Sequence, residues 1–386
     1  MRIVMFYHSL ISDWNHGTAH FLRGIATELI RHGHDLRIYE PKDAWSIQNL
    51  IASHRYEPIR KFQSAFPHLV SNRYAPDSLD LDQVLDNADL VIVHEWNEPE
   101  LVERIGSCRA RTRNLRLLFH DTHYRMVTDR TSRAAVNLKN YDGVLAFGKV
   151  IRDLYLSQGW AQRAWTWHEA ADTRIFYPRE KANEQDDLVW IGNWGDGERA
   201  LELYEFLIDP VKDLGLRAVA YGVRYPDHAR IALREAGIDY AGWLPDYEVP
   251  EMFSKFRATI HVPRRPYGKA LPGIPTIRTF EAMACGIPLI VSPWVDIEGL
   301  FKPGQDFLVA ANGDEMKRLL KNLLHDREMA RELTHHAYNT IVSQHTCAHR
   351  VQELYAICRD LGIDPGTPLA GLELSRAPGG KEAWER

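Results

Sequence analysis

Short apolar runs alternate with segments of helical periodicity along the N-terminal half of the chain. The helical pattern is clearest over residues 18–31, where Phe21, Ile25 and Leu29 fall on one face and Gly33 follows as a C-terminal stop. The apolar runs cover residues 3–7, 36–39, 90–93, 115–119 and 144–147. This alternation predicts a parallel sheet with crossover helices.

A second cycle of the same kind begins after a charged stretch at residues 179–187. Helices are predicted over 198–208 and 227–236, and the apolar runs cover residues 188–191, 218–221, 260–262 and 287–291. The two cycles predict an α/β protein with two Rossmann-like domains, each a doubly wound parallel sheet. Ligands of open α/β sheets bind at the carboxyl ends of the strands, so we expect the domains to face a central cleft.

The length of the chain agrees with two domains. At 386 residues, 45% of them hydrophobic, the chain exceeds a usual single domain and can fill two cores. We place the N-terminal domain at residues 1–178 and the C-terminal domain at 179–346. A last helix is expected within 347–365. Residues 366–386 mix glycine, proline and charges without periodicity and are expected to be disordered.

Charge and cysteine content narrow the functional class. The formal net charge of −5 gives no global electrostatic reason to expect a nucleic-acid partner. The four cysteines are scattered and form no paired motif, as suits a reducing cytosol. No apolar segment approaches the roughly 20 residues that span a bilayer, and the chain opens with a strand-like run rather than a signal peptide. We therefore expect a cytoplasmic protein without a membrane span, and its oligomeric state stays open.

Residues 275–293 contain the most informative motif of the chain. A short helix that begins after Gly273 and Pro275 would direct free N–H groups and the positive end of its dipole at the preceding loop, which favours a phosphate there. Glu281 lies about one and a half turns into this helix and is placed to accept hydrogen bonds from a vicinal diol such as a ribose. The segment therefore predicts a nucleotide site.

The same segment resembles the donor-nucleotide motif of GT-B glycosyltransferases, in particular retaining enzymes of the glycosyl transferases group 1 type. Their pattern is a glutamate, seven residues, a second glutamate and then Ala-x-Ala-x-Gly. Segments within residues 240–263 and 306–324 follow the same family template. One departure is that the first glutamate, eight residues before Glu281, is Gly273 here. A branch that resembles the spore-maturation-type glycosyltransferases keeps the Arg-Thr-Phe-Glu core at 278–281 without that acid, so we place the chain nearest that branch.

The donor side gathers candidates from two loops and two helices. Gly192 and Asn193 follow the first strand of the second half, and Arg199 opens the next helix. By resemblance, Arg199 lies near the donor diphosphate. The alternatives are an ordinary tight turn for the loop and an intrahelical salt bridge to Glu281 for Arg278. The donor-binding set is Gly192, Asn193, Arg199, Gly273, Ile274, Pro275, Thr276, Arg278, Thr279 and Glu281.

A histidine-containing loop follows the first strand, where the family has a glycine-rich acceptor-side loop. His16 and His20 are placed to donate to a sugar hydroxyl or a phosphate, but a histidine at a helix start is more often a cap or a surface residue. Glu95 and Trp96 follow the apolar run at 90–93, and an aromatic ring at such a strand end is suited to stacking on a sugar. The acceptor-side set is His16, Gly17, Thr18, His20, Glu95 and Trp96.

His120 and Asp121 follow the apolar run at 115–119, so both project from a carboxyl strand end. By resemblance, they match the His-Asp pair often found at this point in GT-B enzymes. His120 and His123 are three residues apart, as metal ligands can be, but no third ligand has a recognisable spacing. We therefore expect no metal.

The resemblance implies a metal-independent glycosyltransferase without a cofactor. It would move a sugar from a nucleotide diphosphate sugar, with UDP favoured, to a hydroxyl of a glycan, a lipid-linked acceptor or a small molecule. The resemblance implies retention of configuration, with the leaving phosphate taking the acceptor proton. It also implies a last helix that crosses back onto the N-terminal domain. Because catalysis would be mainly positioning and neutralisation of the diphosphate, the catalytic set is His120, Asp121, Arg199 and Lys269.

Two alternatives stay open. A nucleotide-sugar epimerase on the same fold would use Asp121, Glu95 and His120 as acids and bases. A nucleotide-sugar-binding protein that has lost catalysis is supported best by Gly273 in place of the first motif glutamate.

Overall fold

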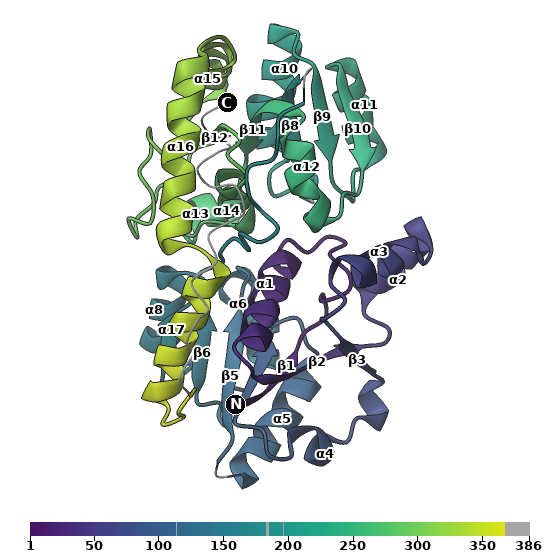
Figure 1. Ribbon diagram of the computed structural model, residues 1–386, viewed down its shortest axis with the longest axis vertical. Coiled ribbons are helices and arrows are strands. Elements are labelled where there is room, and N and C mark those ends of the chain that lie inside the picture. The colour runs from purple at the N-terminus through teal and green to yellow at the C-terminus, as the bar shows by residue number, and fades with distance from the viewer. Residues whose placement is uncertain (113, 183–184, 196, 367–386) are drawn as a thin grey trace. The chain divides into compact units, whose positions relative to one another are not determined.

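The computed structural model describes residues 1–112, 114–182, 185–195 and 197–366. Within these residues the chain forms two compact units (Figure 1). Of the described residues, unit 1 contains Met1–Glu169 and the segment 347–366, and unit 2 contains Ala170–Thr346. The tail predicted over 366–386 lies outside the described residues, except for Gly366.

Unit 1 contains a seven-stranded parallel sheet with the strand order β3-β2-β1-β4-β5-β6-β7. Every residue of β4 is buried, and β5 is buried after its first residue, which is the pattern of central parallel strands covered on both faces. The strands are β1 (Arg2–Phe6), β2 (Asp35–Pro41), β3 (Ser71–Tyr74), β4 (Leu90–His94), β5 (Arg116–Asp121), β6 (Gly143–Ala146) and β7 (Ala164–Thr166).

Helices connect the strands of unit 1. They are α1 (Thr18–Arg31), α2 (Trp45–His54), α3 (Glu57–Ala65), the 3-10 turn η1 (Pro76–Ser78), α4 (Leu81–Leu85), α5 (Pro99–Arg111), α6 (Arg125–Thr128), α7 (Arg130–Ala135), α8 (Lys149–Ser157) and α17 (Cys347–Asp360). α1 covers the residues predicted to be helical. α17, the yellow helix in Figure 1, follows unit 2 in sequence but packs on α1, where the Tyr355 hydroxyl lies 2.8 Å from His32 Nδ1 and 2.6 Å from His34 Nε2.

Unit 2 contains a six-stranded parallel sheet with the order β10-β9-β8-β11-β12-β13. Read in chain order, this arrangement repeats that of the first six strands of unit 1, and both are doubly wound Rossmann-like sheets, as predicted. Leu188 and Trp190 pack in one buried cluster and Val189 and Ile191 in another, so β8 is covered on both faces. The strands are β8 (Asp186–Ile191), β9 (Ala218–Tyr221), β10 (Ile238–Gly242), β11 (Phe256–His261), β12 (Leu289–Val291) and β13 (Leu308–Val309).

The helix predicted over 198–208 is not a regular α-helix. α9 (Ala200–Leu203) runs into a π-helical turn, η2 (Tyr204–Ile208), before α10 (Asp209–Leu214). Pro210 explains the turn, because it lacks the N–H for an α-helical bond and its ring crowds the carbonyl of Phe206. The other helices of unit 2 are α11 (Asp227–Glu235), the 3-10 turn η3 (Asp246–Glu248), α12 (Val249–Phe253), α13 (Arg265–Lys269), α14 (Ile277–Ala284), α15 (Gly313–His325) and α16 (Arg327–Gln344).

Candidate functional site

One feature of topology locates a candidate site in each sheet. In unit 1 the chain order reverses between β1 and β4, and in unit 2 it reverses between β8 and β11. The connections on either side of such a switch point leave on opposite faces of the sheet, which opens a crevice beyond the carboxyl ends of the two strands. Residues that follow these four strands are therefore well placed for ligand binding.

Arg199 spans the switch point of unit 2. Its Nε donates to the Asn193 carbonyl at 3.1 Å and its Nη1 donates to the Val262 carbonyl at 3.0 Å. These bonds tie the loop after β8 to the residue after β11. The side chain is buried, with its guanidinium carbon 5.2 Å from the centre of the Trp190 ring. Since arginine keeps its charge even when buried, this edge of the sheet carries a fixed positive charge.

The loop that Arg199 anchors is tightly built. A Cβ on Gly192 would lie 2.6 Å from an atom of the Trp190 ring, so packing alone requires glycine there. Asn193 accepts a hydrogen bond from the Val223 N–H through its Oδ1 at 3.0 Å. Gly192 therefore agrees with the tight-turn interpretation, and the ligand-directed chemistry of this loop rests on Arg199.

His261 joins the same edge to the start of α14, and the sequence did not single it out. It ends β11, and its Nε2 lies 3.1 Å from the hydroxyl of Thr276, the N-cap residue of α14. Burial, with smaller contributions from Arg199 and Arg278, lowers the pKa of His261 to about 3, so the ring is neutral near neutral pH. This link holds the amino end of α14 beside β11, where the helix dipole favours an anion.

Arg278 and Glu281 form the ion pair that was the alternative interpretation of Arg278. Arg278 Nη1 lies 2.5 Å from Glu281 Oε2, one turn further along α14. Glu281 is fully buried rather than open at the mouth of a crevice. Thr279 is also buried, and its N–H donates to the Thr276 carbonyl at 3.0 Å. A ribose hydroxyl at this point has to share Glu281 with Arg278.

Backbone geometry explains the missing acid of the family motif. Gly273 has a φ of 89°, and a Cβ there would lie 2.3 Å from Ile297 Cγ1. Both the left-handed backbone and the clash exclude glutamate from this loop conformation. Ile274 and Pro275 are buried, and the Ile274 carbonyl accepts from the Trp294 indole N–H at 3.1 Å. The loop before α14 is thus shaped by packing.

Lys269 differs from the other donor-side candidates. It ends α13 and is exposed, whereas Arg199 and Glu281 are buried. Bonds and shared loops otherwise bring the donor-side set to one edge of unit 2, around the loop after β8, the end of β11 and the start of α14.

Histidines and carboxylates build the corresponding edge of unit 1. β4 ends in His94 and β5 contains His120 near its end, and the register of the sheet pairs these two residues directly. An acid follows each of them, Glu95 after His94 and Asp121 after His120. The dipeptide of histidine and acid therefore occurs twice, side by side, at the carboxyl edge of the sheet.

Tyr7 and His8, which follow β1, connect to these strands. Tyr7 Oη lies 2.6 Å from His120 Nδ1, and burial raises the pKa of Tyr7. We therefore assign the hydroxyl as the donor and place the His120 proton on Nε2. His8 Nε2 lies 2.9 Å from His16 Nε2, which brings the histidine loop after β1 into the same group.

Burial keeps the histidines of this edge neutral. It lowers the pKa of His16 and of His120 to about 3. Burial also lowers the pKa of His8 and of His94, helped by repulsion from neighbouring histidines. A neutral imidazole donates one hydrogen bond and accepts another, so it suits a hydroxyl-rich ligand better than a phosphate.

The two histidines of the segment 16–20, which contains the start of α1, are neither exposed nor the capping residue of the helix. His16 is 9% exposed and His20 is 3% exposed. The N-cap residue of α1 is Gly17, which makes no side-chain capping bond, and Thr18 is the first helical residue. The surface and cap alternatives are therefore wrong for both histidines.

Glu95 and Asp121 form a buried pair of acids. Burial raises the pKa of Asp121 to about 7, and burial together with repulsion from Asp121 raises that of Glu95. Asp121 Oδ2 accepts from the Tyr155 hydroxyl at 2.9 Å. Glu95 Oε1 accepts from the Thr122 N–H at 3.1 Å, and Arg125 lies 3.7 Å from Glu95 Oε2. Because two acids in one desolvated site do not both ionise easily, the pair retains a proton near neutral pH.

Sequence reasoning missed several members of this edge, although a signal was present. The apolar runs at 90–93 and 115–119 are both followed by a histidine and an acid, and neighbouring parallel strands bring such positions together. Trp96, which was predicted, is partly exposed, and its ring centre lies 4.1 Å from the Arg125 guanidinium carbon. The missed residues are Tyr7, His8, His94, Thr122 and Tyr155.

His123 makes local hydrogen bonds just after β5. Its backbone N–H donates to Asp121 Oδ1 at 3.2 Å, and its Nδ1 accepts from the Arg125 N–H at 3.2 Å. Within the described parts of the chain, no three His, Cys, Asp or Glu side chains are arranged to hold a metal ion. In those same ranges, none of the helices combines the length and the apolar character that a membrane crossing requires.

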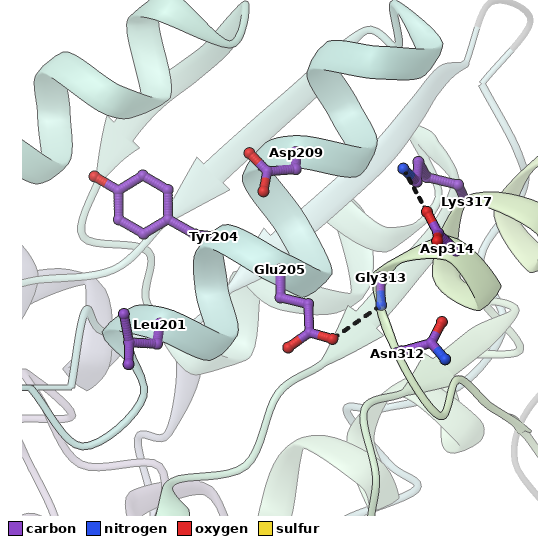
Figure 2. A pocket seen from close by; sticks show the side chains of 8 residues that line it. All are labelled: Leu201, Tyr204, Glu205, Asp209, Asn312, Gly313, Asp314 and Lys317. Atoms are coloured by element: carbon purple, nitrogen blue, oxygen red, sulfur yellow. Dashed lines mark hydrogen bonds and ion pairs between the residues drawn. The ribbon is translucent and has the colours of Figure 1, made fainter.

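A cavity of about 400 Å³ lies beside η2 and α15 and contains none of the donor-side candidates. Figure 2 shows its side chains, which come from α9, η2 and α10 on one side and from the start of α15 on the other. Glu205 Oε1 accepts from the Gly313 N–H at 3.1 Å, and Lys317 Nζ lies 2.8 Å from Asp314. Since internal partners occupy these polar groups, we assign the cavity no role.

Comparison with known proteins finds a family match in the C-terminal part of the chain. Residues 199–356 match the model of a glycosyl transferase-like family. The match covers somewhat less than half of the 386 residues and includes Arg199, Arg278 and Glu281. No curated protein matches the chain.

Several solved structures share the fold at low sequence identity. Sucrose-phosphate synthase from Thermosynechococcus elongatus has a TM-score of 0.66 and 14% identity, over 94% of this chain and 99% of its own. Anabaena HepE in complex with UDP and glucose has a TM-score of 0.66 and 15% identity, over 93% and 99%. An alpha-glucosyltransferase in complex with UDP and DNA has a TM-score of 0.66 and 14% identity, over 93% and 99%. The chain therefore has the GT-B fold, as predicted, and its C-terminal half contains a glycosyl transferase-like region.

Proposed function

We propose that the protein is a glycosyltransferase that moves a sugar from a nucleotide diphosphate sugar to an acceptor hydroxyl. The observation that carries the proposal is Arg199 at the switch point of unit 2, within the region that matches the glycosyl transferase-like family. UDP is the favoured carrier, because structures of the same fold were solved with UDP. The nearness to the spore-maturation-type branch stays a prediction.

The donor diphosphate would bind at the carboxyl edge of unit 2. Arg199 supplies a fixed charge there, and the amino end of α14 after Thr276 supplies N–H groups and a positive dipole end. Lys269 is exposed and can move toward a bound diphosphate. Glu281, shared with Arg278, would hold the ribose. Positive groups that neutralise the leaving diphosphate supply the main catalytic effect, so we propose that the reaction needs no metal.

The acceptor would bind at the carboxyl edge of unit 1. His120 Nε2 is buried and has no hydrogen-bond partner among the described residues, so it is available to a ligand hydroxyl. His16 and Trp96 would border the same acceptor. Glu95 and Asp121 retain a proton between them, and a protonated acid is a poor general base for the direct displacement that would invert configuration. We therefore propose retention of configuration, with the departing diphosphate taking the acceptor proton.

The side chains at the carboxyl edge of unit 1 indicate the chemical class of the acceptor only in part. Its neutral histidines favour a hydroxyl-rich compound, such as a glycan, a lipid-linked sugar or a small polyol. The alpha-glucosyltransferase of the same fold is in complex with DNA. Our prediction of no nucleic-acid partner therefore rests on the net charge of −5 alone.

Calorimetric titration with UDP, GDP, ADP and dTDP, in the presence of a chelator, tests the donor site. We expect UDP to bind, and Glu281→Gln to weaken its binding by about tenfold or more, because the ribose loses a charged acceptor. Glu235→Gln is the matched control, since Glu235 is exposed on α11. Absence of binding by all four diphosphates would overturn the proposal. An epimerised sugar formed together with free UDP, without any acceptor, would point to the epimerase instead.

A further inference from the structure

A second cavity of unit 2, of about 1080 Å³, lies at the edge of the sheet opposite to the donor-side candidates. Its lining includes Gln185 directly before β8, Phe256 at the start of β11 and Pro288 directly before β12. These are the amino ends of parallel strands, whereas Arg199 and Thr276 lie at the carboxyl ends. Along β8 the two edges are separated by roughly 15–20 Å. We call this cavity the amino-edge pocket.

The amino-edge pocket has a strong excess of positive charge. Glu180 is the single acid among the described residues that line it. The cations come from three segments: the loop before β8, the start of β11, and the first turns of α16. They are Arg179, Lys181, Arg257, Arg327 and Arg331. Because the whole chain has a net charge of −5, this local excess is opposite in sign to the average surface.

Only part of this charge is neutralised within the protein. Arg257 lies 3.4 Å from Asp187, and Arg331 lies 2.6 Å from Glu328. Lys181 and Arg327 have no ion-pair partner in the described parts of unit 2. The surrounding protein partly desolvates the Lys181 amine and lowers its pKa, and no carboxylate of the described residues acts against this effect. An ammonium that loses hydration without gaining a counter-charge is stabilised by an anion from solution.

Apolar side chains form the other part of the wall. Phe253, Ile287 and Leu323 are buried and contribute to the lining, together with Pro288. A volume of about 1080 Å³ lies at the upper end of the range of small-molecule sites. Because the wall has both a cationic and an apolar part, the better fit is a molecule with charged groups and a less polar body.

We propose that the amino-edge pocket is a binding site for a phosphorylated small molecule, separate from the donor site. Guanidinium groups bind phosphate oxygens through paired hydrogen bonds, and a lysine adds a mobile point charge. Lys181 and Arg327 are the main anion-binding groups, because neither forms an ion pair with another described residue. Binding here involves no covalent step and does not depend on the proposed transferase activity.

Calorimetric titration of the full chain with pyrophosphate, and then with a hexose bisphosphate, tests this site. The variant is Lys181→Ala/Arg327→Ala. Both side chains are exposed, so the variant is expected to fold normally. The matched control is Lys212→Ala/Arg234→Ala, which removes the same two residue types from exposed positions on α10 and α11.

We expect pyrophosphate binding to weaken by about tenfold or more in the pocket variant, because two charge-assisted contacts are lost. The control is expected to stay within about twofold of the wild type. A residue-level readout is amine acylation followed by mass spectrometry, in which pyrophosphate should protect Lys181 but not Lys212. Any binding of UDP should be the same in both variants.

Equal binding of pyrophosphate by the pocket variant and the control would overturn the proposal, as would acylation of Lys181 that pyrophosphate does not slow. A wild-type chain that binds neither probe at millimolar concentration would also overturn it. If UDP binding fails while Lys181 is still protected, the donor-site proposal is lost and the amino-edge pocket stands.

Discussion

The carboxyl edges of the two sheets have the same strand order but opposite chemistry. In unit 1 the switch point is surrounded by buried neutral histidines and by a pair of acids, Glu95 and Asp121, that retains a proton. In unit 2 it is crossed by Arg199 and faced by the amino end of α14. We infer from this comparison that topology sets the place of a candidate site, and that the side chains at the strand ends set the chemistry that the site offers to a ligand.

Burial makes the ionisable groups of the first edge neutral but leaves the arginine of the second edge charged, because the ordinary pKa values of these residue types differ. Desolvation lowers the pKa of His120 to about 3 and raises that of Asp121 to about 7, so both are neutral just below neutral pH. The guanidinium of Arg199 keeps its charge under similar burial, because its pKa is far above neutrality. The first edge therefore suits hydroxyl groups and the second suits a diphosphate.

Asp121→Asn should give the largest change in unfolding free energy. It tests whether the carboxyl edge of unit 1, which we call the neutral edge, is uncharged. The folded chain holds the Asp121 proton up to about pH 7, whereas an unfolded chain releases it near 3.8. The free energy of unfolding of the wild type therefore falls as pH rises between these values, by about 1.4 kcal/mol per unit and about 4 kcal/mol in total. Asparagine cannot ionise, so the variant should lack this loss. Urea denaturation from pH 4 to pH 8 measures the difference.

The histidines of this edge have the opposite effect on stability. Their lowered pKa values mean that the unfolded chain takes up protons first, so His16 and His120 make stability rise with pH from about 3 to 6.5. Both histidines are present in the wild type and in Asp121→Asn, so their contribution cancels when the two stability curves are subtracted. Parallel stability curves for the wild type and Asp121→Asn would show that Asp121 is ionised in the folded chain and that the neutral-edge description is wrong.

Arg199→Ala should give the next largest change in unfolding free energy. It tests the carboxyl edge of unit 2, which we call the charged edge. The substitution leaves the Asn193 and Val262 carbonyls without their donor, which should cost about 3 kcal/mol of unfolding free energy. It should also weaken UDP binding by about a hundredfold. Arg199→Lys should recover part of the affinity but little of the stability, because lysine has no fork to reach both carbonyls. Urea denaturation and calorimetry measure the two effects.

Arg230→Ala is the matched control for this result. Arg230 also donates to a carbonyl, that of Tyr225, and its guanidinium lies 5.5 Å from the Tyr240 ring centre, but it is exposed on α11. Its loss should cost less than about 1 kcal/mol and leave UDP binding unchanged. If both variants lose UDP affinity equally, Arg199 has no special place at the switch point.

Sequence reasoning predicted the elements of these edges better than their contacts. The apolar runs located both sheets, and the periodicity around Phe21 gave the bounds of α1, because local patterns determine local structure. The bond from Tyr7 to His120 spans 113 positions of the chain and follows from strand order, which a single sequence does not reveal. The ion pair of Arg278 and Glu281 was foreseen as an alternative, since it depends only on helical spacing.

Gly273→Ala should give the smallest change, and it tests whether backbone shape sets the donor edge. Gly273 and Gly304 have φ values of 89° and 85°, so alanine should cost each position about 1 kcal/mol through the left-handed backbone alone. At Gly304 the new Cβ has no atom within 4 Å, whereas at Gly273 it would meet Ile297 Cγ1 at 2.3 Å. We expect Gly273→Ala to lose about 1 kcal/mol more than Gly304→Ala, and to weaken UDP binding because the loop before α14 moves.

Gly273→Glu, which restores the family acid, should bind UDP no better than Gly273→Ala, since the loop and not the missing carboxylate limits the site. Equal stability of the two alanine variants, or tighter UDP binding by Gly273→Glu than by the wild type, would show that the loop can accept a side chain and that the contrast between the two edges lies in charge alone.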